Sequence, residues 1–579
     1  MNNYVPPQKK WMVRASIPDE IESELAGYPE ILQQLLYNRG IHSQEDAEIY
    51  INKQGSLHDP FLLMGMEKAV NRILQALEKQ ESIVVYGDYD VDGVTATALL
   101  VKALQAMDAR VRGFIPNRFE EGYGLSKEPL QKLSDESVDL LITVDCGIRS
   151  WQEVDFWNGL GKDLIITDHH EPREKVPEAL AVICPKQKGD LYPEKNLAGV
   201  GLAFKLCEAL YKKQPFAQKQ VEDFYDLVAV GTVADIVPLT GENRTLVKAG
   251  LNELHFGKRL GLRSLANVAG ISIEKLNARD IGFGIGPRLN ASGRLETAQM
   301  AYDLLMSEDI NVVGKLAQQL DDLNRRRQEQ TREHVEKAEC LLAEKPEADI
   351  IIAFDPEFNK GIVGLVASKL VEKYYRPAVV GQIEEGQIRA SCRSIPEFHI
   401  TKALDECADL FEHHGGHAMA AGFTLLPENE PSFRERLESI AKRELGEMEL
   451  NPELIIDKEI RLEEARPAEI FDALAKLEPT GQTNPEAIFC SYNVQVLQFW
   501  PVGEGRHLKL KLKAGGVIYN AIAFRQGHLK ETLPKFIDIS YTFDKNSYKG
   551  IEETQLNIRD IRPSQIASRE QCNETQAVE

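Results

Sequence analysis

Short apolar runs alternate with amphipathic stretches between residues 80 and 240. These runs are rich in Val and Ile, and their sequences are ESIVVYGD, VRGFIP, DLLITVDCG, DLIITDHH, AVIC and LVAVGTVAD. Strand-like runs separated by helical patterns are typical of βαβ units, whose strands lie parallel in one sheet. The pattern therefore predicts an α/β domain with a mainly parallel sheet, which we place at residues 76–305.

The pattern changes on both sides of this domain. Residues 1–75 contain amphipathic stretches such as PEILQQLLYNRG, which predict a peripheral helical region. The polar residues 306–346 predict one long helix that connects two globular parts, and we interpret their run Arg325-Arg326-Arg327 as a solvated face. A second α/β pattern occupies residues 347–430, and a helical acidic spacer is expected at 431–451. The fold class is therefore α/β, with two α/β domains joined by a long helix.

The C-terminal part alternates apolar and polar residues with a period of two. HLKLKLKAGG and YNAIAF are examples, and such alternation indicates strands with one buried face. A series of short strands of this kind predicts a small β-barrel of the OB type at residues 452–562. The polar composition of residues 563–579 predicts a disordered tail.

Composition excludes some classes of protein. The chain is 43% hydrophobic and 27% charged, and it has no apolar run of the roughly 18 residues that a membrane helix requires. The N-terminus, MNNYVPPQKKWMVR, lacks the apolar stretch of a secretory signal. The eight cysteines form no CxxC pair, which argues against a zinc cluster and a disulfide framework. We therefore expect a cytoplasmic protein without a membrane partner.

The net charge of −22 bears on nucleic-acid binding, because binding to phosphates favours basic surfaces. The charge is an average over the whole chain, however. A deep acidic metal site can coexist with a separate basic channel that holds the substrate. The net charge therefore does not exclude a nucleic acid as the substrate.

The strongest local signal is the segment IVVYGDYDVDGVTATALL. Asp88, Asp90 and Asp92 alternate directly after an apolar strand, and such residues point the same way in an extended chain. Three carboxylates on one face repel each other unless cations lie between them, so the spacing predicts a metal site. An EF-hand loop begins in the same way. That loop needs Glu at its twelfth position, where this chain has Leu99, and a helix rather than a strand before it.

Further acidic residues end the next apolar runs. Asp145 follows LLITV, Asp168 with His169 and His170 follows LIIT, and Asp235 follows GTVA. Because the carboxyl ends of parallel strands meet at one edge of a sheet, we expect these residues to converge on one crevice. Carboxylates with a single coordinating imidazole favour Mn²⁺ or Mg²⁺ over zinc. Two such ions can activate water and stabilise both the attacking and the leaving oxygen, which predicts phosphoester hydrolysis.

The segments YGDYDVDG, VDCG, TDHH and VAD, in this order, resemble the four motifs of the DHH phosphoesterase family. The resemblance implies a site for two Mn²⁺ or Mg²⁺ ions. The metal ligands that it implies are Asp90, Asp92, Asp145, His169 and Asp235, with Asp88 in the same loop as a further ligand or catalytic acid. It also implies that His170 faces the scissile phosphate as a hydrogen-bond donor or general acid–base, and that Asp168 orients an imidazole through its ring N–H.

Segments elsewhere narrow this resemblance to the RecJ family within the DHH phosphoesterases. They are LAGVGLAFKL, DLVAVGTVADIVPL and GPRLNASGRL in the first domain, GIVGLVASKL and GGHAMAAGF in a second domain of the DHHA1 type, and LEPTGQTNPEAIF and GEGRHLKLKL in the barrel. The resemblance implies a single-stranded-DNA-specific 5′→3′ exonuclease that releases nucleoside 5′-monophosphates in DNA repair and recombination. We further expect a monomer whose partners are single-stranded DNA, a single-strand-binding protein and a helicase.

Some positions depart from the pattern of that family. Tyr86 stands where many relatives have His, Phe358-Asn359 replaces a Trp-His pair, and Thr480 and Thr483 interrupt a Phe-Gly-x-Gly stretch. None of these residues is among the implied metal ligands. They therefore bear on how the substrate is held and leave the chemistry unchanged.

Basic and glycine-rich segments predict how a strand is held, because guanidinium groups bind phosphates through paired N–H groups and glycine lets a backbone approach closely. The candidate phosphate-binding and nucleic-acid-binding residues are Arg288, Asn290, Arg294, Arg393, Ser394, Gly415, Gly416 and His417, and, on one strand face of the barrel, His507, Lys509 and Lys511. The glycines of GPRLNASGRL argue against a regular helix there. Simpler alternatives are a pair of surface arginines and a tight turn with a structural histidine.

Two other functions remain open. A DHH phosphodiesterase acting on short oligonucleotides or cyclic dinucleotides shares the four motifs, although the barrel and the connecting helix argue against it. An inactive replication scaffold is the other class, since relatives exist in which metal ligands have been lost. Every implied ligand is present in this chain, which argues against a scaffold.

Overall fold

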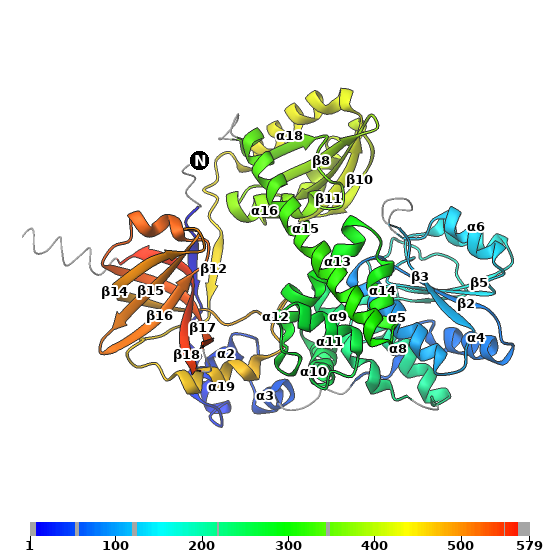
Figure 1. The fold of residues 1–579 in the computed structure, drawn as a ribbon, viewed down its shortest axis with the longest axis horizontal. Coiled ribbons are helices and arrows are strands. Elements are labelled where there is room, and N and C mark those ends of the chain that lie inside the picture. Colours follow the sequence, from blue (N-terminus) through cyan, green and yellow to red (C-terminus); the bar gives the residue numbers. More distant parts are fainter. Residues whose placement is uncertain are drawn as a thin grey trace, which may run out of the picture. The chain divides into compact units, whose positions relative to one another are not determined.

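The computed structural model describes residues 7–51, 57–117, 124–216, 219–342, 348–548 and 551–564 (Figure 1). The chain forms two compact units. The first comprises Met1–Pro7, Ser56–Leu450 and Gly481–Thr483, and the second comprises Gln8–Gly55, Asn451–Thr480 and Asn484–Glu579. The tail predicted to be disordered lies outside the described residues, apart from Pro563 and Ser564.

A five-stranded parallel sheet forms the centre of the first α/β domain. Its strands, in spatial order, are β3 (Val111–Phe114), β2 (Ile83–Gly87), β4 (Leu140–Val144), β5 (Asp163–Thr167) and β6 (Ala181–Ile183). Every neighbouring pair in this sheet is parallel. Five of the six apolar runs therefore form the parallel sheet that the sequence predicted.

Helices cover both faces of this sheet. One core includes residues of α4 (Met66–Glu78), α5 (Val91–Gln105) and α8 (Gly199–Lys213), and the other includes residues of α6 (Lys127–Asp135) and α7 (Trp151–Gly159). Val85 of β2 belongs to the first core and Val84 to the second, since successive residues of a strand point to opposite faces. Burial on both sides explains why the strands are almost continuously apolar.

The sixth apolar run is a helix. LVAVGTVAD lies in α9 (Tyr225–Ala234), in which Leu227 and Thr232 and all residues between them are buried. A helix that is surrounded by core has no polar face, so its sequence lacks the 3.6-residue period and resembles a buried strand. The prediction of a strand there was wrong, and Asp235 follows the end of a helix.

Further helices lead from α9 to the long connecting helix. They are α10 (Gly241–His255), α11 (Leu260–Val268), α12 (Ala278–Asp280), the π-helix Ile281–Ile285, α13 (Gly286–Leu295) and α14 (Gln299–Met306). GPRLNASGRL forms α13, so the expectation of an irregular segment was wrong. Its proline lies in the first turn of α13, directly after the π-helix. The predicted connecting helix is confirmed as α15 (Ile310–Leu342).

The second α/β domain contains a mixed sheet. Its strands, in spatial order, are β10 (Phe411–His417), β11 (Ala420–Leu425), β9 (Gln387–Arg393), β8 (Ala378–Glu384) and β7 (Ile351–Asp355). Its helices are α16 (Val363–Tyr374), α17 (Ile400–Asp405) and α18 (Glu430–Leu445). The segment expected to be a spacer at 431–451 is mostly α18. Phe433, Leu437 and Ile440 of this helix are buried in the core of the domain, so it is an integral part of the domain.

Five long strands of the second unit, orange to red in Figure 1, form the predicted barrel. Their order is β14 (Phe489–Val502), β15 (His507–Ala514), β16 (Val517–Ala523), β18 (Ile551–Pro563) and β17 (Phe536–Tyr548), and β14 pairs again with β17, which closes the barrel. The short β13 (Lys458–Glu459) extends the sheet beside β14, and α19 (Pro467–Leu477) packs into the same core.

The N-terminal residues belong to this unit, so the prediction of a peripheral region was wrong. β1 (Lys10–Val13) pairs in parallel with β12 (Glu453–Ile456). Three helices follow, namely α1 (Asp19–Glu24), α2 (Glu30–Tyr37) and α3 (Gln44–Ile51). Leu32 and Leu35 of α2 are buried in the core of the barrel. Across the described part of the chain, none of the helices combines the length and the apolar character needed to cross a membrane.

Candidate active site

Three strand ends bring acidic residues together at one edge of the first sheet. Gly87, Val144 and Thr167 are register partners across β2, β4 and β5. The residues that follow them in sequence are Asp88, Asp145 and Asp168. Because the partners lie side by side, these three acids leave the sheet at the same level. This is the convergence that the sequence predicted.

Asp90 and Asp92 reach the site from the start of a helix, so the prediction of one extended strand face was wrong. Asp90 is the N-cap of α5, and its side chain accepts hydrogen bonds from the N–H of Asp92 at 2.9 Å and of Gly93 at 3.1 Å. Asp92 lies in the first turn of the same helix. Carboxylates are favourable at both positions because the first N–H groups of a helix lack helical partners.

Asp92 also binds the amino end of a second helix. Its Oδ2 accepts from the N–H of Gly199 at 2.6 Å and its Oδ1 from the N–H of Val200 at 2.7 Å, at the start of α8. A Cβ at position 199 would lie 2.6 Å from the Cβ of Asp145, so only glycine fits there. The sequence analysis missed this role of Gly199, although a glycine pair before a helical pattern in LAGVG was the signal for it.

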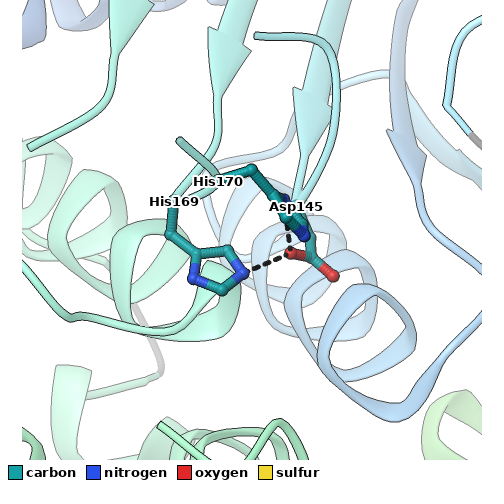
Figure 2. Close-up of side chains that lie close together, drawn as sticks. All are labelled: Asp145, His169 and His170. Atoms are coloured by element: carbon teal, nitrogen blue, oxygen red, sulfur yellow. Dashed lines mark ion pairs between the residues drawn. The ribbon is translucent and has the colours of Figure 1, made fainter. Parts of the chain in front are cut away.

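Figure 2 shows His169 and Asp145 facing each other. His169 Nε2 lies 3.1 Å from Asp145 Oδ1, 3.6 Å from Asp235 Oδ2 and 3.9 Å from Asp92 Oδ2. Asp145 has a φ of +63°, and so does Ile236, the residue after Asp235. This backbone conformation is strained, above all for a β-branched residue, and such strain clusters at functional sites.

His170 is oriented by Asp168. Asp168 Oδ1 accepts from the backbone N–H of His170 at 3.0 Å and lies 2.8 Å from its Nδ1, while Oδ2 accepts from the N–H of Ile148. Burial opposes the charge of both groups. The hydrogen bond and charge of each partner outweigh burial, so the pKa of Asp168 is lowered and the pKa of His170 is raised. With Nδ1 bound to Asp168, Nε2 is the ring nitrogen that can meet a phosphate.

Buried atoms without hydrogen bonds indicate where metal ions fit. Among the described residues, Asp145 Oδ1, Asp235 Oδ2 and both ring nitrogens of His169 are buried and form no hydrogen bond. Buried polar atoms in proteins are almost always paired, so these atoms need a partner that the chain does not supply. Carboxylate oxygens and one imidazole are donors that suit Mn²⁺ or Mg²⁺.

The electrostatics of the cluster support the same conclusion. Burial, followed by the charge of Asp90, raises the pKa of Asp92 to about 7. Burial, followed by the charge of Asp92, raises the pKa of Asp235 to about 9 and that of Asp145 well above its usual range. Burial lowers the pKa of His169 to about 3, which leaves a neutral imidazole that can ligate a metal. A cation beside these carboxylates would stabilise their ionised forms and lower their pKa values.

Three groups of side chains are close enough to hold an ion. They are Asp88, Asp90 and Asp145; Asp92, His169 and Asp235; and Asp145, His169 and His170. The first two groups together contain all of the predicted ligands. His169 of the second group touches Asp145 of the first. This arrangement can hold two neighbouring ions, as two-metal phosphoester hydrolysis requires.

The candidate arginine of α13 is held by internal partners. Arg288 Nε donates to Asp321 Oδ1 of α15 at 2.9 Å, and its Nη1 donates to the carbonyl of Gly284 at 2.8 Å. Asn290 and Arg294 are partly exposed on the same helix. Another side of α13 packs at Gly293 against the metal-binding loop, which is the segment of Asp88, Tyr89 and Asp90 between β2 and α5. Arg288 is therefore not an ordinary solvated arginine.

The structure brings Arg393 and His417 together. Both are register partners of Ala420, from β9 and β10 on either side of β11, so their side chains leave the same face of the sheet. Gly415 precedes the close pairing at Gly416, where a Cβ would lie 2.4 Å from the carbonyl oxygen of Ala420. A backbone conformation with φ of +153° also requires glycine at position 416.

Ser394 is occupied by internal contacts. Its hydroxyl donates to the carbonyl of Phe398 at 2.6 Å, and its backbone N–H donates to the carbonyl of Met419 at 3.0 Å. Both donors are used, and the residue is buried. The geometry therefore opposes the prediction that Ser394 binds phosphate, and Ser394 instead shapes the turn after Arg393.

In the barrel, Lys509 and Lys511 lie on the outer face of β15, and the leucines that alternate with them are buried. Trp500 of β14 is the register partner of Lys509 and is 39% exposed. His507 Nδ1 accepts from the N–H of Arg525 at 2.9 Å, so its ring helps to fix the end of the strand. The barrel thus combines cations and an exposed aromatic ring on neighbouring strands.

Residues outside the predicted set also surround the site. Lys186 lies in the turn after β6, next to β5 at the same sheet edge, and its charge acts on His169 and Asp235. A lysine two positions after the AVIC run was the missed signal. Tyr86, which departs from the family's pattern, donates its hydroxyl to the carbonyl of Gly124 inside the second core, away from the carboxylates.

A buried carboxylate and imidazole cluster at the carboxyl edge of a parallel sheet defines the class of a metal-dependent phosphoesterase. Three family profiles match this chain in order. The DHH family N-terminal domain matches residues 82–232, the DHHA1 domain matches residues 347–443, and the RecJ OB domain matches residues 456–560.

Full-length relatives narrow the class. The chain is 37% identical to the single-stranded-DNA-specific exonuclease RecJ of Bacillus subtilis, over 96% of this chain and 71% of that protein, and 35% identical to that of Escherichia coli, over 94% and 98%. RecJ of Thermus thermophilus has the same fold. Its structure with Mn²⁺ gives a TM-score of 0.83 at 32% identity over 96% of this chain and 80% of that one, and its structure with Mg²⁺ gives 0.76 at 30% over 96% and 79%. The chain belongs to the RecJ family.

The raised pKa values predict how the metal-free protein responds to pH. The folded pKa values of Asp92 and Asp235, about 7 and about 9, exceed the unfolded value of about 4. Stability is therefore highest below the unfolded pKa and is lost as pH rises through the folded values. In EDTA, we expect the melting temperature of the first unit to fall between about pH 6 and 9, and Mn²⁺ to reverse the fall.

Scanning fluorimetry across this pH range, with EDTA or Mn²⁺, measures the effect. Asp235→Asn should flatten the fall in EDTA, because one of the titrating groups is gone. The matched control is Asp155→Asn, at an exposed position on α7, which should leave the pH profile unchanged. A melting temperature in EDTA that does not depend on pH would contradict the assignment of a cation-requiring cluster.

Proposed function

We propose that this chain is a metal-dependent exodeoxyribonuclease that hydrolyses single-stranded DNA from its 5′ end and releases nucleoside 5′-monophosphates. The observation that carries this proposal is the ligand cluster around Asp145 and His169, whose buried oxygen and nitrogen atoms form no hydrogen bond with the chain. The relatives that match nearly the whole chain are single-stranded-DNA-specific exonucleases. DNA repair and recombination is the setting that we expect.

The predicted ligands would hold two ions, Mn²⁺ or Mg²⁺, which supply an activated water and stabilise the phosphoryl oxygens. The contribution of the chain is positional. The amino ends of α5 and α8 fix Asp92, and the left-handed backbone of Asp145 aims its carboxylate at His169. Asp168 holds Nδ1 of His170, so that Nε2 can donate a proton to an oxygen of the scissile phosphate. The raised pKa of His170 supports this role as a donor.

Two surfaces would hold the strand. Arg393 lies beside the amino end of α16, since a Cβ at Gly364 of that helix would lie 3.0 Å from Arg393 Nη2. Arg393 and His417, on the same face of the sheet, would offer cationic and N–H donors to a terminal phosphate. On the barrel, Lys509 and Lys511 can follow a phosphate backbone while Trp500 stacks a base. Alternating cations and aromatic rings suit a single strand, because a duplex does not expose its base faces.

The expected monomeric state, the recruitment by a single-strand-binding protein and a helicase, and the cytoplasmic location remain predictions. The sequence suggests them only through the resemblance to the RecJ family. Sedimentation of the full chain alone would test the monomeric state, and its co-sedimentation with each candidate partner would test the recruitment.

Loss of a metal ligand should abolish hydrolysis without unfolding the protein. Asp145→Asn keeps the volume of the side chain but removes a carboxyl group whose pKa is strongly raised. We expect Mn²⁺-dependent nuclease activity to fall on the order of 10³-fold, since metal assistance contributes several kcal/mol and each 1.36 kcal/mol is tenfold. The melting temperature in EDTA should stay the same or rise. His169→Ala should lose activity in the same way. The control Asp155→Asn should retain activity. Near-full activity of both Asp145→Asn and His169→Ala would disprove the assignment of the site.

Labelled substrates separate the proposed function from its alternatives. A strand labelled at the 5′ end should release labelled mononucleotide at once, whereas a 3′ label should appear only when digestion is complete. Blunt duplex DNA should resist. Faster hydrolysis of a dinucleotide or cyclic dinucleotide than of a long strand would favour the small-substrate phosphodiesterase, and Mn²⁺ binding without any hydrolysis would favour the scaffold. Thin-layer chromatography of timed samples distinguishes these outcomes.

A further inference from the structure

The inward side of α15 changes character along its length. Apolar residues at helical spacing join the core of the first domain at Val313, Ala317 and Leu320, and that of the second domain at Val335, Ala338 and Leu342. Between these two sets, the same spacing places Asn324, Arg327 and Thr331. A stripe that is apolar at both ends and polar in the middle needs a polar partner in the middle.

A buried carboxylate organises the arginines near this stretch. Asp321 is fully buried, and its Oδ1 lies 2.9 Å from Nε and 2.8 Å from Nη2 of Arg288 on α13. Its Oδ2 lies 2.6 Å from Nη2 of Arg325. Arg327 adds a third positive charge, close enough to Arg288 for the two to repel. Burial, followed by this repulsion, lowers the pKa of Arg327. One carboxylate thus pairs with two guanidinium groups, and a third lies near Arg288.

Several buried atoms here have no partner. Within the part of the chain that the structure describes, Arg327 Nε, Asn324 Oδ1 and Gln330 Oε1 are buried without a hydrogen bond, and Arg327 makes no ion pair. Asn324 is only 2% exposed. A carboxamide can present either its oxygen or its NH₂ group, so Asn324 can serve as a donor. Among the described residues, Arg327 is thus a cation without a counter-ion, and its buried Nε is a donor without an acceptor. An anion would supply both.

The location of the cluster connects it with the metal centre. Arg288 lies on α13, and Gly293 of that helix packs against the metal-binding loop so closely that a Cβ would lie 2.8 Å from the carbonyl oxygen of Tyr89. The run Arg325-Arg326-Arg327 is therefore not simply a solvated face, as its sequence suggested. Arg326 and Arg325 are exposed, but Arg327 is partly buried on the inward side.

We propose that Arg288, Arg325 and Arg327, with Asn324 beside them, form a binding site for a phosphate group, and that Asp321 is the positioning residue of this site. The identity of the phosphate rests on the proposed function: we assign it to a phosphodiester of the substrate strand, downstream of the scissile bond. The phosphate of a released nucleoside 5′-monophosphate has the same chemistry. Asp321 acts through the arginines and does not touch the ligand.

The test measures binding in EDTA, so that it does not depend on catalysis. Fluorescence anisotropy of a labelled oligothymidylate with the full-length protein gives Kd as a function of salt. Arg327→Gln should weaken binding about tenfold and reduce the slope of log Kd against log salt by about 0.7, the value for one phosphate contact on a single strand. The matched control is Arg332→Gln, at an exposed position on the same helix, which should change neither quantity.

Asp321→Asn separates positioning from simple charge attraction. Removal of a negative charge should tighten strand binding if the arginines act only through their charge. If Asp321 positions Arg288 and Arg325, the same variant should weaken binding, although the protein becomes more positive. Tighter binding by this variant would overturn the positioning role. Melting temperatures identify a folding defect: Arg327→Gln should not lower that temperature, whereas loss of a purely structural arginine would.

Competition identifies the source of the phosphate. A nucleoside 5′-monophosphate and inorganic phosphate are each titrated against the labelled strand, in wild type and in Arg327→Gln. If the strand alone loses affinity in the variant, the site belongs to the substrate; if the monophosphate loses affinity instead, it belongs to the product. Equal affinity of both proteins for all three probes would overturn the site. A protein that binds strands through Arg327 but hydrolyses none would contradict the proposed function and leave the site in place.

Discussion

Repulsion between buried carboxylates is the interaction on which the rest of this structure depends. Asp92, Asp145 and Asp235 surround one neutral imidazole, in a place where burial already opposes their charge. Hydrophobic packing cannot relieve such repulsion, and only protons or cations can. The surrounding fold holds the carboxylates in place, because three strand ends, two helix starts and one helix end converge on this site.

Close backbone packing is the means by which the fold holds them. Glycines line the site, and added Cβ atoms would collide: at Gly93 with the carbonyl oxygen of Asp88 at 2.5 Å, at Gly231 with Thr95 Oγ1 at 2.3 Å, and at Gly199 with Asp145. These glycines allow neighbouring backbone segments and side chains to approach closely. They are not needed for turns, since none of the three has a positive φ. A rigid frame of this kind keeps the ligands from relaxing apart, so that the repulsion is retained and the affinity for cations is high.

Sequence could predict those features whose cause is local. Buried parallel strands are recognisable because they are apolar throughout, and the acids after β2, β4 and β5 were found for that reason. The same reasoning failed at α9, because a helix buried on every side, from Leu227 to Thr232, has the same apolar sequence as a strand. It also failed at Asp90, which was predicted to continue an extended strand but is the N-cap of α5. Acidic residues at every second position fit both structures. The predicted ligands still lie together in groups that could hold an ion, because residue type, and not backbone geometry, was the basis of their prediction.

Features that depend on distant partners could not be predicted. The spacing of Phe433 and Leu437 in α18 indicates a buried helix face, but the sequence does not show that this face completes the core of the second domain. Arg327 illustrates the same limit. Within the sequence it is the third of three arginines on a polar helix, and solvation is the simplest interpretation. Its environment is set by burial and by Arg288, 39 positions earlier, while the nearby carboxylate of Asp321 pairs with Arg288 and Arg325. The charges that surround an arginine decide whether it is solvated or binds an anion. These charges come together only when the helices pack, so the sequence of one helix does not reveal them.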